Sequence, residues 1–162
     1  MKVKFKFILL VSFSVLCMIV MFITSNTSSQ RQDVKPLLKK YVTLTPNTLP
    51  DIQFLYDSNL VTTQQPYDFL EFFIRKSGHV LEYMILTFVL LMMLPYTKIK
   101  LWLRILIAFI GSFLFASTDE YHQTYVDGRT GHFIDVYTFD TAGIIFGIII
   151  YLLIQSVKRT HR

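Results

Sequence analysis

Four long runs of apolar residues constrain the fold of this chain more than any other feature. They cover residues 7–23, 77–94, 101–117 and 137–154, and none has a charge at its centre. A helix that crosses a bilayer needs about 17 to 25 residues, so each run is long enough to span. Only 17% of the residues are charged, against about 25% in soluble domains. We therefore predict an all-α integral membrane protein, a four-helix bundle that forms a single domain over residues 1–162.

The first run follows three lysines near the N-terminus, Lys2, Lys4 and Lys6. This layout occurs both in signal peptides and in membrane anchors whose N-terminus stays in the cytoplasm. The run is longer than most signal-peptide cores, and residues 24–28 lack an Ala-x-Ala-like cleavage site. We expect an uncleaved anchor, with a signal peptide as the alternative.

The distribution of basic residues predicts the orientation in the membrane. The positive-inside rule places segments rich in Lys and Arg in the cytoplasm. Nine basic residues with no acidic residue among them fall at the two termini and around the connection between the second and third runs: Lys2, Lys4, Lys6, Lys98, Lys100, Arg104, Lys158, Arg159 and Arg162. Both termini are therefore expected in the cytoplasm, and segments 24–76 and 118–136 outside it. On this interpretation the net charge of +5 reports topology and gives no reason to expect a nucleic-acid partner.

The segment 24–76 is too long for a simple connector, so we expect it to be partly structured. Between Val34 and Tyr41 apolar residues recur at i, i+3, i+4 and i+7, with Asp33 in the N-cap position. This pattern predicts a short helix that lies on the membrane surface or packs on the protein. Asp68 is placed to cap a helix that runs directly into the second span.

Polar and ionisable side chains gather at the ends of the last three spans that are predicted to face outward. They are Arg75, His79, Glu82 and Tyr83 in the second, Asp119, Glu120, His122 and Gln123 in the third, and Asp135 and Asp140 in the fourth. In the third, Asp119, His122 and Gln123 share a face, and Glu120 points about 100° away. Because ionisable groups beside spans are costly and often functional, we predict one outward-facing site. Solvated boundary residues or structural ion pairs are the alternative.

Several of these residues form a recognisable pattern. It comprises Lys76-Ser77-Gly78-His79 followed by Tyr83, then Asp119-Glu120-Tyr121-His122-Gln123, Gly128-Arg129, Asp135, and Asp140-Thr141-Ala142-Gly143 with Gly147. The pattern resembles the VanZ-like family of bacterial membrane proteins. The resemblance implies a small cell-envelope protein, associated in the founding member with resistance to the glycopeptide teicoplanin. It also implies the signature positions Lys76, His79, Tyr83, Asp119, Glu120, Gln123, Arg129 and Asp135. Asp127 stands where family members often have proline, and the match at Asp140 allows an offset of one residue.

Three kinds of function remain open for this site. We favour a binding or accessory protein for an envelope lipid, a cell-wall precursor or a glycopeptide, because the chain has no nucleophile elbow, phosphate loop or hydrolase motif. The expected ligand-binding residues are Lys76, Tyr83, His122, Gln123, Arg129, Asp135 and Asp140. The alternative is a membrane enzyme that acts on a lipid-linked substrate with His79, Glu82, Asp119 and Glu120 as acid and base groups. A proton-coupled carrier with a relay through Asp140, Glu82 and His79 is the third.

A metal site is a further possibility, because two ligand pairs, His79 with Glu82 and Asp119 with His122, stand on two helices. Such residues suit zinc or iron. Dinuclear sites in bundles recruit further carboxylates, however, and Lys76 or Arg129 would oppose a cation. We expect neither a metal nor a cofactor.

Gly143 and Gly147 have the Gly-x-x-x-Gly spacing that lets two helices approach closely. We expect these glycines to serve packing within the monomer in preference to dimerisation. The lipid bilayer is the one partner that the apolar runs require.

Overall fold

The computed structural model describes residues 2–160 and consists mainly of long helices. Four helical stretches are long and apolar enough to cross a membrane. They are α1 (Lys2–Ser25), α3 (Pro66–Met93), α4 (Leu101–Gln123) and a last stretch made of α5 (Phe133–Asp135), the π-helical turn η3 (Val136–Asp140) and α6 (Thr141–Thr160). The prediction of an all-α bundle with four candidate spans is confirmed.

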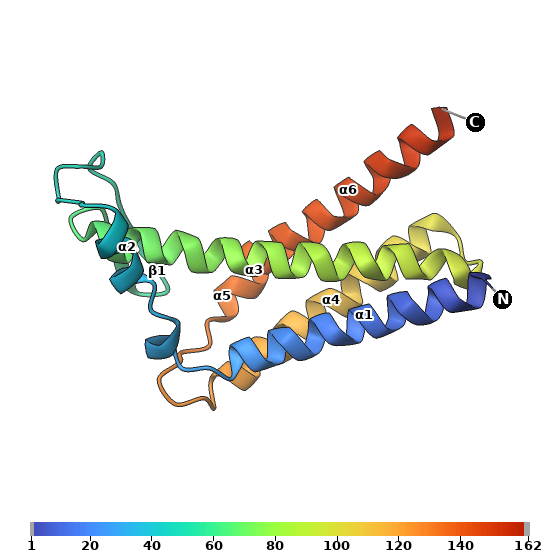
Figure 1. Cartoon of the computed structure of the whole chain (residues 1–162), viewed down its shortest axis with the longest axis horizontal. Helices are drawn as coiled ribbons and strands as arrows, with labels where there is room; N and C mark the ends of the chain where they lie inside the picture. Colours follow the sequence, from blue (N-terminus) through green and yellow to red (C-terminus); the bar gives the residue numbers. More distant parts are fainter. Residues whose placement is uncertain (1, 161–162) are drawn as a thin grey trace.

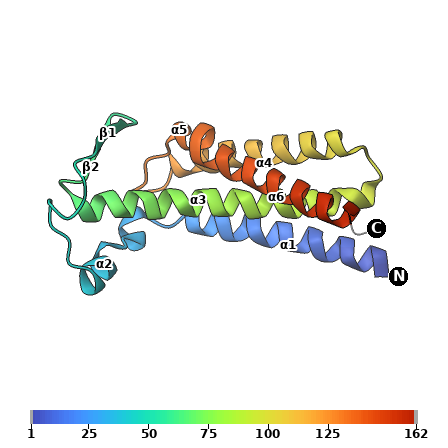
Figure 2. The same ribbon diagram turned by 90° about the horizontal axis from the view of Figure 1, so that it is seen from above.

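α1, α3 and α4 run along the long axis, and α6 leans away from them toward the C-terminus (Figure 1). α3 packs against α1, α4 and α6. In the second view it lies between α1 and α4, and α6 crosses it (Figure 2). α1 begins and α6 ends at the same end as the short turn η2 (Leu94–Thr97), which connects α3 to α4. The opposite end carries two short strands and is called the hairpin end below.

The helices extend beyond the predicted spans at the hairpin end. α3 begins at Pro66, where proline suits the first turn of a helix because its missing N–H has no partner there. The helix near Asp68 does continue into the second span, as expected. Its N-cap residue is Gln65 and not Asp68. Asp68 lies in the first turn, where a carboxylate favours the helix dipole, and its Oδ1 lies 2.9 Å from Lys35 Nζ.

The segment between α1 and α3 is partly structured. It contains the 3₁₀ turn η1 (Ser29–Gln32), the helix α2 (Lys35–Tyr41) and an antiparallel hairpin of β1 (Gln53–Tyr56) and β2 (Asn59–Thr62). The short helix is present where expected, and Asp33 Oδ1 accepts the Lys35 backbone N–H at 2.8 Å. Val34 is the N-cap residue, which corrects the expected capping position by one.

The hairpin was not predicted. Its two turn residues, Asp57 and Ser58, have φ values of 45° and 65°. Two positive φ values are typical of the tight turns that match the twist of paired strands, and Asn-Gly is their usual sequence signal. The chain uses Asp-Ser at this turn and has only four residues in each strand, so neither the turn nor the alternation was visible in the sequence.

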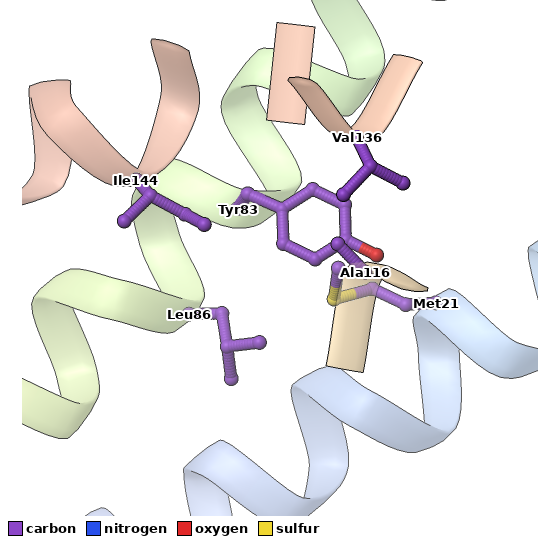
Figure 3. Close-up of a cluster of buried hydrophobic side chains, with 6 residues drawn as sticks. All are labelled: Met21, Tyr83, Leu86, Ala116, Val136 and Ile144. Carbon is purple, nitrogen blue, oxygen red and sulfur yellow. The ribbon is translucent and has the colours of Figure 1, made fainter. Parts of the chain in front are cut away.

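Two apolar clusters form the core. The first gathers one or two side chains from each of the long helices: Met21, Tyr83, Leu86, Ala116, Val136 and Ile144. Figure 3 shows the Tyr83 ring among them, with its hydroxyl toward Val136, Ala116 and Met21. The second cluster lies toward the end with the termini and contains Leu91, Leu94, Ala108 and Tyr151.

The packing of α6 on α3 depends on two glycines. A Cβ atom on Gly143 would overlap the Val80 carbonyl, and one on Gly147 would lie 2.6 Å from the Met84 oxygen. Backbones approach this closely only where a side chain is missing. The Gly-x-x-x-Gly spacing is thus used inside the monomer, and it brings the start of α6 against the part of α3 that carries His79.

Candidate functional site

A cavity of about 440 Å³ opens at the hairpin end, between α3, the end of α4, α5 and the hairpin. Its walls combine charged, polar and aromatic side chains: Tyr56, Asn59, Val61, Asp68, Glu71, Phe72, Arg75, Lys76, His79, Gln123, Arg129, Thr130, His132 and Asp135. Five of the site residues expected from the sequence are among them: Lys76, His79, Gln123, Arg129 and Asp135. The polar ends of the three helices and the hairpin therefore do meet around one cavity.

Lys76 and Asp135 form the central ion pair of the cavity wall. Lys76 Nζ lies 2.5 Å from Asp135 Oδ1 and 2.6 Å from Oδ2, and the side chains are 12% and 3% exposed. The Lys76 ammonium also lies over the rings of Tyr56, Phe72 and Phe139, at 4.9 to 5.7 Å from their centroids. An ammonium between a carboxylate and three aromatic faces is held in place from several sides.

Tyr56 connects the hairpin to this pair. Its hydroxyl donates to Asp135 Oδ1 at 2.5 Å. Burial and this bond raise the pKa of the phenol well above its usual value, so the group stays protonated and remains a donor. The expected site did not include Tyr56, because no sequence signal placed the hairpin near the helix ends.

A second contact ties the hairpin to the loop between α4 and α5. The side chain of Asp57, at the hairpin turn, bonds to His132 Nδ1. The other ring nitrogen of His132 lies 2.7 Å from Thr130 Oγ1. The hairpin therefore forms part of the cavity wall through two side-chain contacts.

Arg129 anchors the same loop to the end of α1. Its Nε donates to the Thr27 carbonyl at 2.8 Å and its Nη2 to the Thr24 carbonyl at 3.1 Å and to Gln32 Oε1. Carbonyls at a helix C-terminus lack partners within the helix, so a cation there satisfies them and favours the dipole. Nη1 has no hydrogen-bond partner within residues 2–160.

Arg75 is exposed on α3 and lines the cavity with Arg129. Among the described residues it has no carboxylate within ion-pair distance. Burial and the positive charge of Arg75 lower the pKa of Arg129. The cavity thus contains two guanidinium groups that repel each other and have no ion-pair partner in the described part of the chain.

His79 pairs with Asp140 and not with Glu82, the carboxylate nearest to it along α3. His79 Nδ1 lies 3.0 Å from Asp140 Oδ1. Asp140 is fully buried at the end of the π-helical turn. Glu82, one turn further along α3, has no hydrogen bond or ion pair within residues 2–160. An imidazole fixed by a carboxylate has the arrangement used for proton transfer.

The π-helical turn explains why Asp135 and Asp140 both point inward. In an α-helix, positions five apart differ by about 140° around the axis, so they do not share a face. In a π-helix the hydrogen bonds join residues five apart and bring such positions onto one side. Asp135 thereby meets Lys76 while Asp140 meets His79.

Glu120 and Asp119 are both buried, but they face different neighbours. Glu120 Oε2 accepts the His132 backbone N–H at 2.8 Å, and its other oxygen has no hydrogen-bond partner in residues 2–160. Asp119 Oδ2 accepts Ser25 Oγ at 2.7 Å and Gln123 Nε2 at 2.9 Å. Consecutive positions differ by roughly 100° around a helix axis. Asp119 therefore faces α1, and Glu120 faces His79 and Asp140.

Six residues of the expected site do not line the cavity: Glu82, Tyr83, Asp119, Glu120, His122 and Asp140. Tyr83 and His122 have quite different surroundings. Tyr83 is part of the first apolar cluster (Figure 3). The His122 ring lies tilted against the ring of Phe22, with 4.6 Å between the ring centroids, and it lines a separate cavity that includes Arg31. His122 shares a helix stripe with Asp119, but α1 covers that stripe and separates it from the cavity.

Sequence reasoning missed four residues that build the site: Ser25, Gln32, Tyr56 and His132. All four lie outside the polar stripes of the spans.

Comparison with known proteins agrees with the resemblance. A family model described as VanZ/LLP1 matches residues 9–155. No curated protein and no solved structure matches the chain. Because the match covers nearly the whole chain, the protein belongs to the VanZ/LLP1 family.

Proposed function

We propose that this membrane protein binds an anionic, lipid-linked ligand of the cell envelope in the cavity at the hairpin end. The observation that carries the proposal is the pair Arg75 and Arg129, two guanidinium groups that line one cavity without a carboxylate partner in the described residues. Guanidinium groups recognise phosphate and carboxylate through paired hydrogen bonds. An anion between them would relieve their mutual repulsion.

The other charges of the cavity support this assignment, because they are already paired. Lys76 is neutralised by Asp135. Asp68 and Glu71 share Lys35, with nitrogen–oxygen distances of 2.9 and 3.4 Å. His132 is bonded to Asp57. Lys35 balances only one of its two carboxylates, so one negative charge stays on that side of the cavity. Arg75 and Arg129 are the cationic groups of the lining that have no carboxylate partner among the described residues.

A neighbouring apolar groove favours a lipid over a soluble anion. The groove is lined by Phe73, Lys76, Ser77, Val80, Leu81 and Phe139, and it shares Lys76 with the cavity. Phe73 and Leu81 are exposed on α3, one of the helices apolar enough to cross a bilayer. A ligand with its anionic group at the arginines could place its chain in this groove.

The position of the site relative to the cell is part of the proposal. The nine basic residues at the two termini and around the α3–α4 connection support a cytoplasmic location for that end. The hairpin end would then face the outside, where envelope precursors are used. Resemblance to a family whose founding member is associated with teicoplanin resistance supports glycopeptide resistance as the cellular outcome.

Binding can be tested with a short-chain polyprenyl phosphate, using the matching polyprenol as the uncharged control. The protein in mild detergent should bind the phosphate and not the alcohol. Arg75→Gln should weaken binding at least tenfold, because a hydrogen bond to a charged group contributes about 1.5–3 kcal/mol. Thermophoresis on labelled protein measures both affinities.

The matched control is Arg31→Gln, which removes an exposed arginine that lines a different cavity. Its affinity should equal that of the wild type. Equal binding of phosphate and alcohol by the wild type would contradict the proposal. In cells, expression of the wild type should raise the inhibitory concentration of teicoplanin, and the Arg75 variant should not.

The bond between His79 and Asp140 favours an enzyme as the second candidate. His79 lines the cavity, so a bound ligand would lie within its reach. Replacement of His79 by Ala should then abolish turnover of a radiolabelled polyprenyl phosphate or diphosphate and leave binding intact. The binding role would be favoured if the wild type shows no turnover and the His79 variant loses binding to the same extent as it loses teicoplanin resistance.

A further inference from the structure

Three potential metal ligands converge beneath the cavity, on three separate elements. His79 on α3, Glu120 on α4 and Asp140 at the end of η3 each offer one ligand atom, and these atoms lie within 4.8 Å of one another. We propose that the three residues bind one divalent transition-metal ion, with zinc as the best match. This inference stands without the anionic ligand proposed above and departs from the expectation, drawn from the sequence, that no metal binds.

Burial of the two carboxylates is the first argument. Glu120 is 1% exposed and Asp140 is 0% exposed. One oxygen of each, Glu120 Oε1 and Asp140 Oδ2, is buried with no hydrogen-bond partner among the described residues. Buried carboxylates without partners are costly, and a bound cation removes that cost.

The geometry of the group is the second argument. His79 Nδ1 and Asp140 Oδ1 are 3.0 Å apart, and ligand atoms around a tetrahedral zinc ion lie about 3.3 Å apart. A cation between these atoms would take the place of the proton that the pair shares. Glu120 would complete three protein ligands after a small movement of its side chain.

The ligand types select the class of ion. One imidazole with two carboxylates suits zinc or manganese better than calcium or magnesium, which prefer oxygen ligands alone. Two carboxylates with a neutral imidazole carry a charge of −2, which a divalent ion balances. Lys76, the nearest positive group on α3, is already paired with Asp135 and therefore opposes the ion only weakly.

The cavity gives the site an entry path. His79 lines its wall, so an ion can reach the group from the hairpin end. Three protein ligands leave one position of a tetrahedral site open to water or to a molecule in the cavity, as in catalytic zinc sites. The other carboxylates that line the cavity, those of Asp68, Glu71 and Asp135, form ion pairs with lysines. Among the described residues they belong to no comparable group of potential metal ligands.

The test measures metal in protein that carries no polyhistidine tag. Cells are grown in medium supplemented with zinc and manganese, and the full chain is purified in mild detergent and dialysed. Its metal content is then measured by inductively coupled plasma mass spectrometry. We expect one zinc or manganese ion per chain. Stripping the ion with a chelator should lower the melting temperature, and added Zn²⁺ should restore it, because an ion that binds the folded state stabilises it.

Two variants assign the ligands. His79→Ala and the double variant E120Q/D140N should both lose the ion and the Zn²⁺-dependent rise in melting temperature. The matched controls are His122→Ala and D119N. They remove a histidine and a buried carboxylate from the end of α4, which also carries Glu120, but neither residue belongs to the proposed ligand group. Both variants should retain the ion. Wild-type protein that holds no stoichiometric ion and shows no site on titration with Zn²⁺ would overturn the proposal, as would retention of the ion by both ligand variants.

Discussion

At the scale of single residues, Asp135 holds the cavity wall together, because side chains from two other elements bond to it. Lys76 comes from α3 and Tyr56 from β1. The sequence placed Asp135 and Lys76 at the site, but it did not indicate that they neutralise each other. Their pairing leaves Arg75 and Arg129 as the cationic groups available to a ligand.

Loss of Lys76 should destabilise the protein strongly. Lys76→Met leaves the Asp135 carboxylate buried without its cation, which costs about 3–5 kcal/mol. Thermal unfolding in detergent, followed by circular dichroism, should show a clear drop in melting temperature. The double variant K76M/D135N should recover much of it, because no unpaired charge remains.

Lys35→Met is the control for this experiment, since Lys35 pairs with Asp68 and Glu71 at a more exposed position. Exposed pairs contribute at most about 1 kcal/mol. Similar losses for the Lys35 and Lys76 variants would mean that burial of the Lys76 pair has no energetic effect.

The Tyr56 hydroxyl should contribute a smaller amount. Tyr56→Phe removes one donor to Asp135 and keeps the ring beside Lys76, so we expect a loss of about 1 kcal/mol. Tyr125→Phe is matched to it, because the Tyr125 hydroxyl bonds only to the exposed Tyr121 hydroxyl. The melting temperature of that control should stay near the wild-type value, and a larger effect there than at Tyr56 would contradict the assignment.

At the scale of elements, the close approach of α6 to α3 determines which side chains meet. Gly143 packs on Val80, the residue after His79. Asp140 lies three positions before Gly143 and therefore reaches His79. The π-helical turn then places Asp135 against Lys76. The site depends on this helix pair as much as on its charged residues.

A larger residue at Gly143 should separate the two helices. Gly143→Val forces its side chain into the Val80 backbone, and overpacking of this kind costs about 1–3 kcal/mol or more. The matched variant is Gly111→Ala in α4, where an added Cβ meets nothing within 4 Å. It should raise stability by about 0.5–1 kcal/mol, because alanine favours a helix over glycine. The melting temperature of Gly143→Val should therefore lie below that of the wild type, and the melting temperature of Gly111→Ala should lie above it.

At the scale of the whole molecule, the up-and-down arrangement of the helices places the site at the hairpin end. The start of α1 and the end of α6 lie at the opposite end. Which end faces the cytoplasm is a prediction from the lysines and arginines. The apolar helices do not determine this direction, because they fit a bilayer in either orientation.

Cysteine labelling tests the orientation. In a background without Cys17, a cysteine that replaces exposed Asp127 should react with a membrane-impermeant maleimide in intact cells. One that replaces exposed Thr97 should react only after permeabilisation. Gly131 is unsuitable, because a Cβ there would overlap the Glu120 carbonyl. The reverse labelling pattern would contradict both the topology and an extracytoplasmic ligand.

The sequence by itself determined the four helices, their membrane character and the gathering of polar groups at one end. These properties follow from the length of each apolar run and from the spacing of polar residues along a helix, both of which are local. The same local spacing correctly separated Asp119 from Glu120 by a helix face. The family resemblance identified Arg129 and Asp135, and both line the cavity.

The tertiary structure alone decided the partners. His79 meets Asp140 and not Glu82, Tyr83 lies in the core, and a hairpin that no sequence signal revealed brings Tyr56 to Asp135. The periodicity of one helix shows which residues share a face, but it carries no information about which other helix covers that face. That choice depends on the contact of α6 with α3 at two glycines and on one π-helical turn, and both become visible only when the helices are packed together.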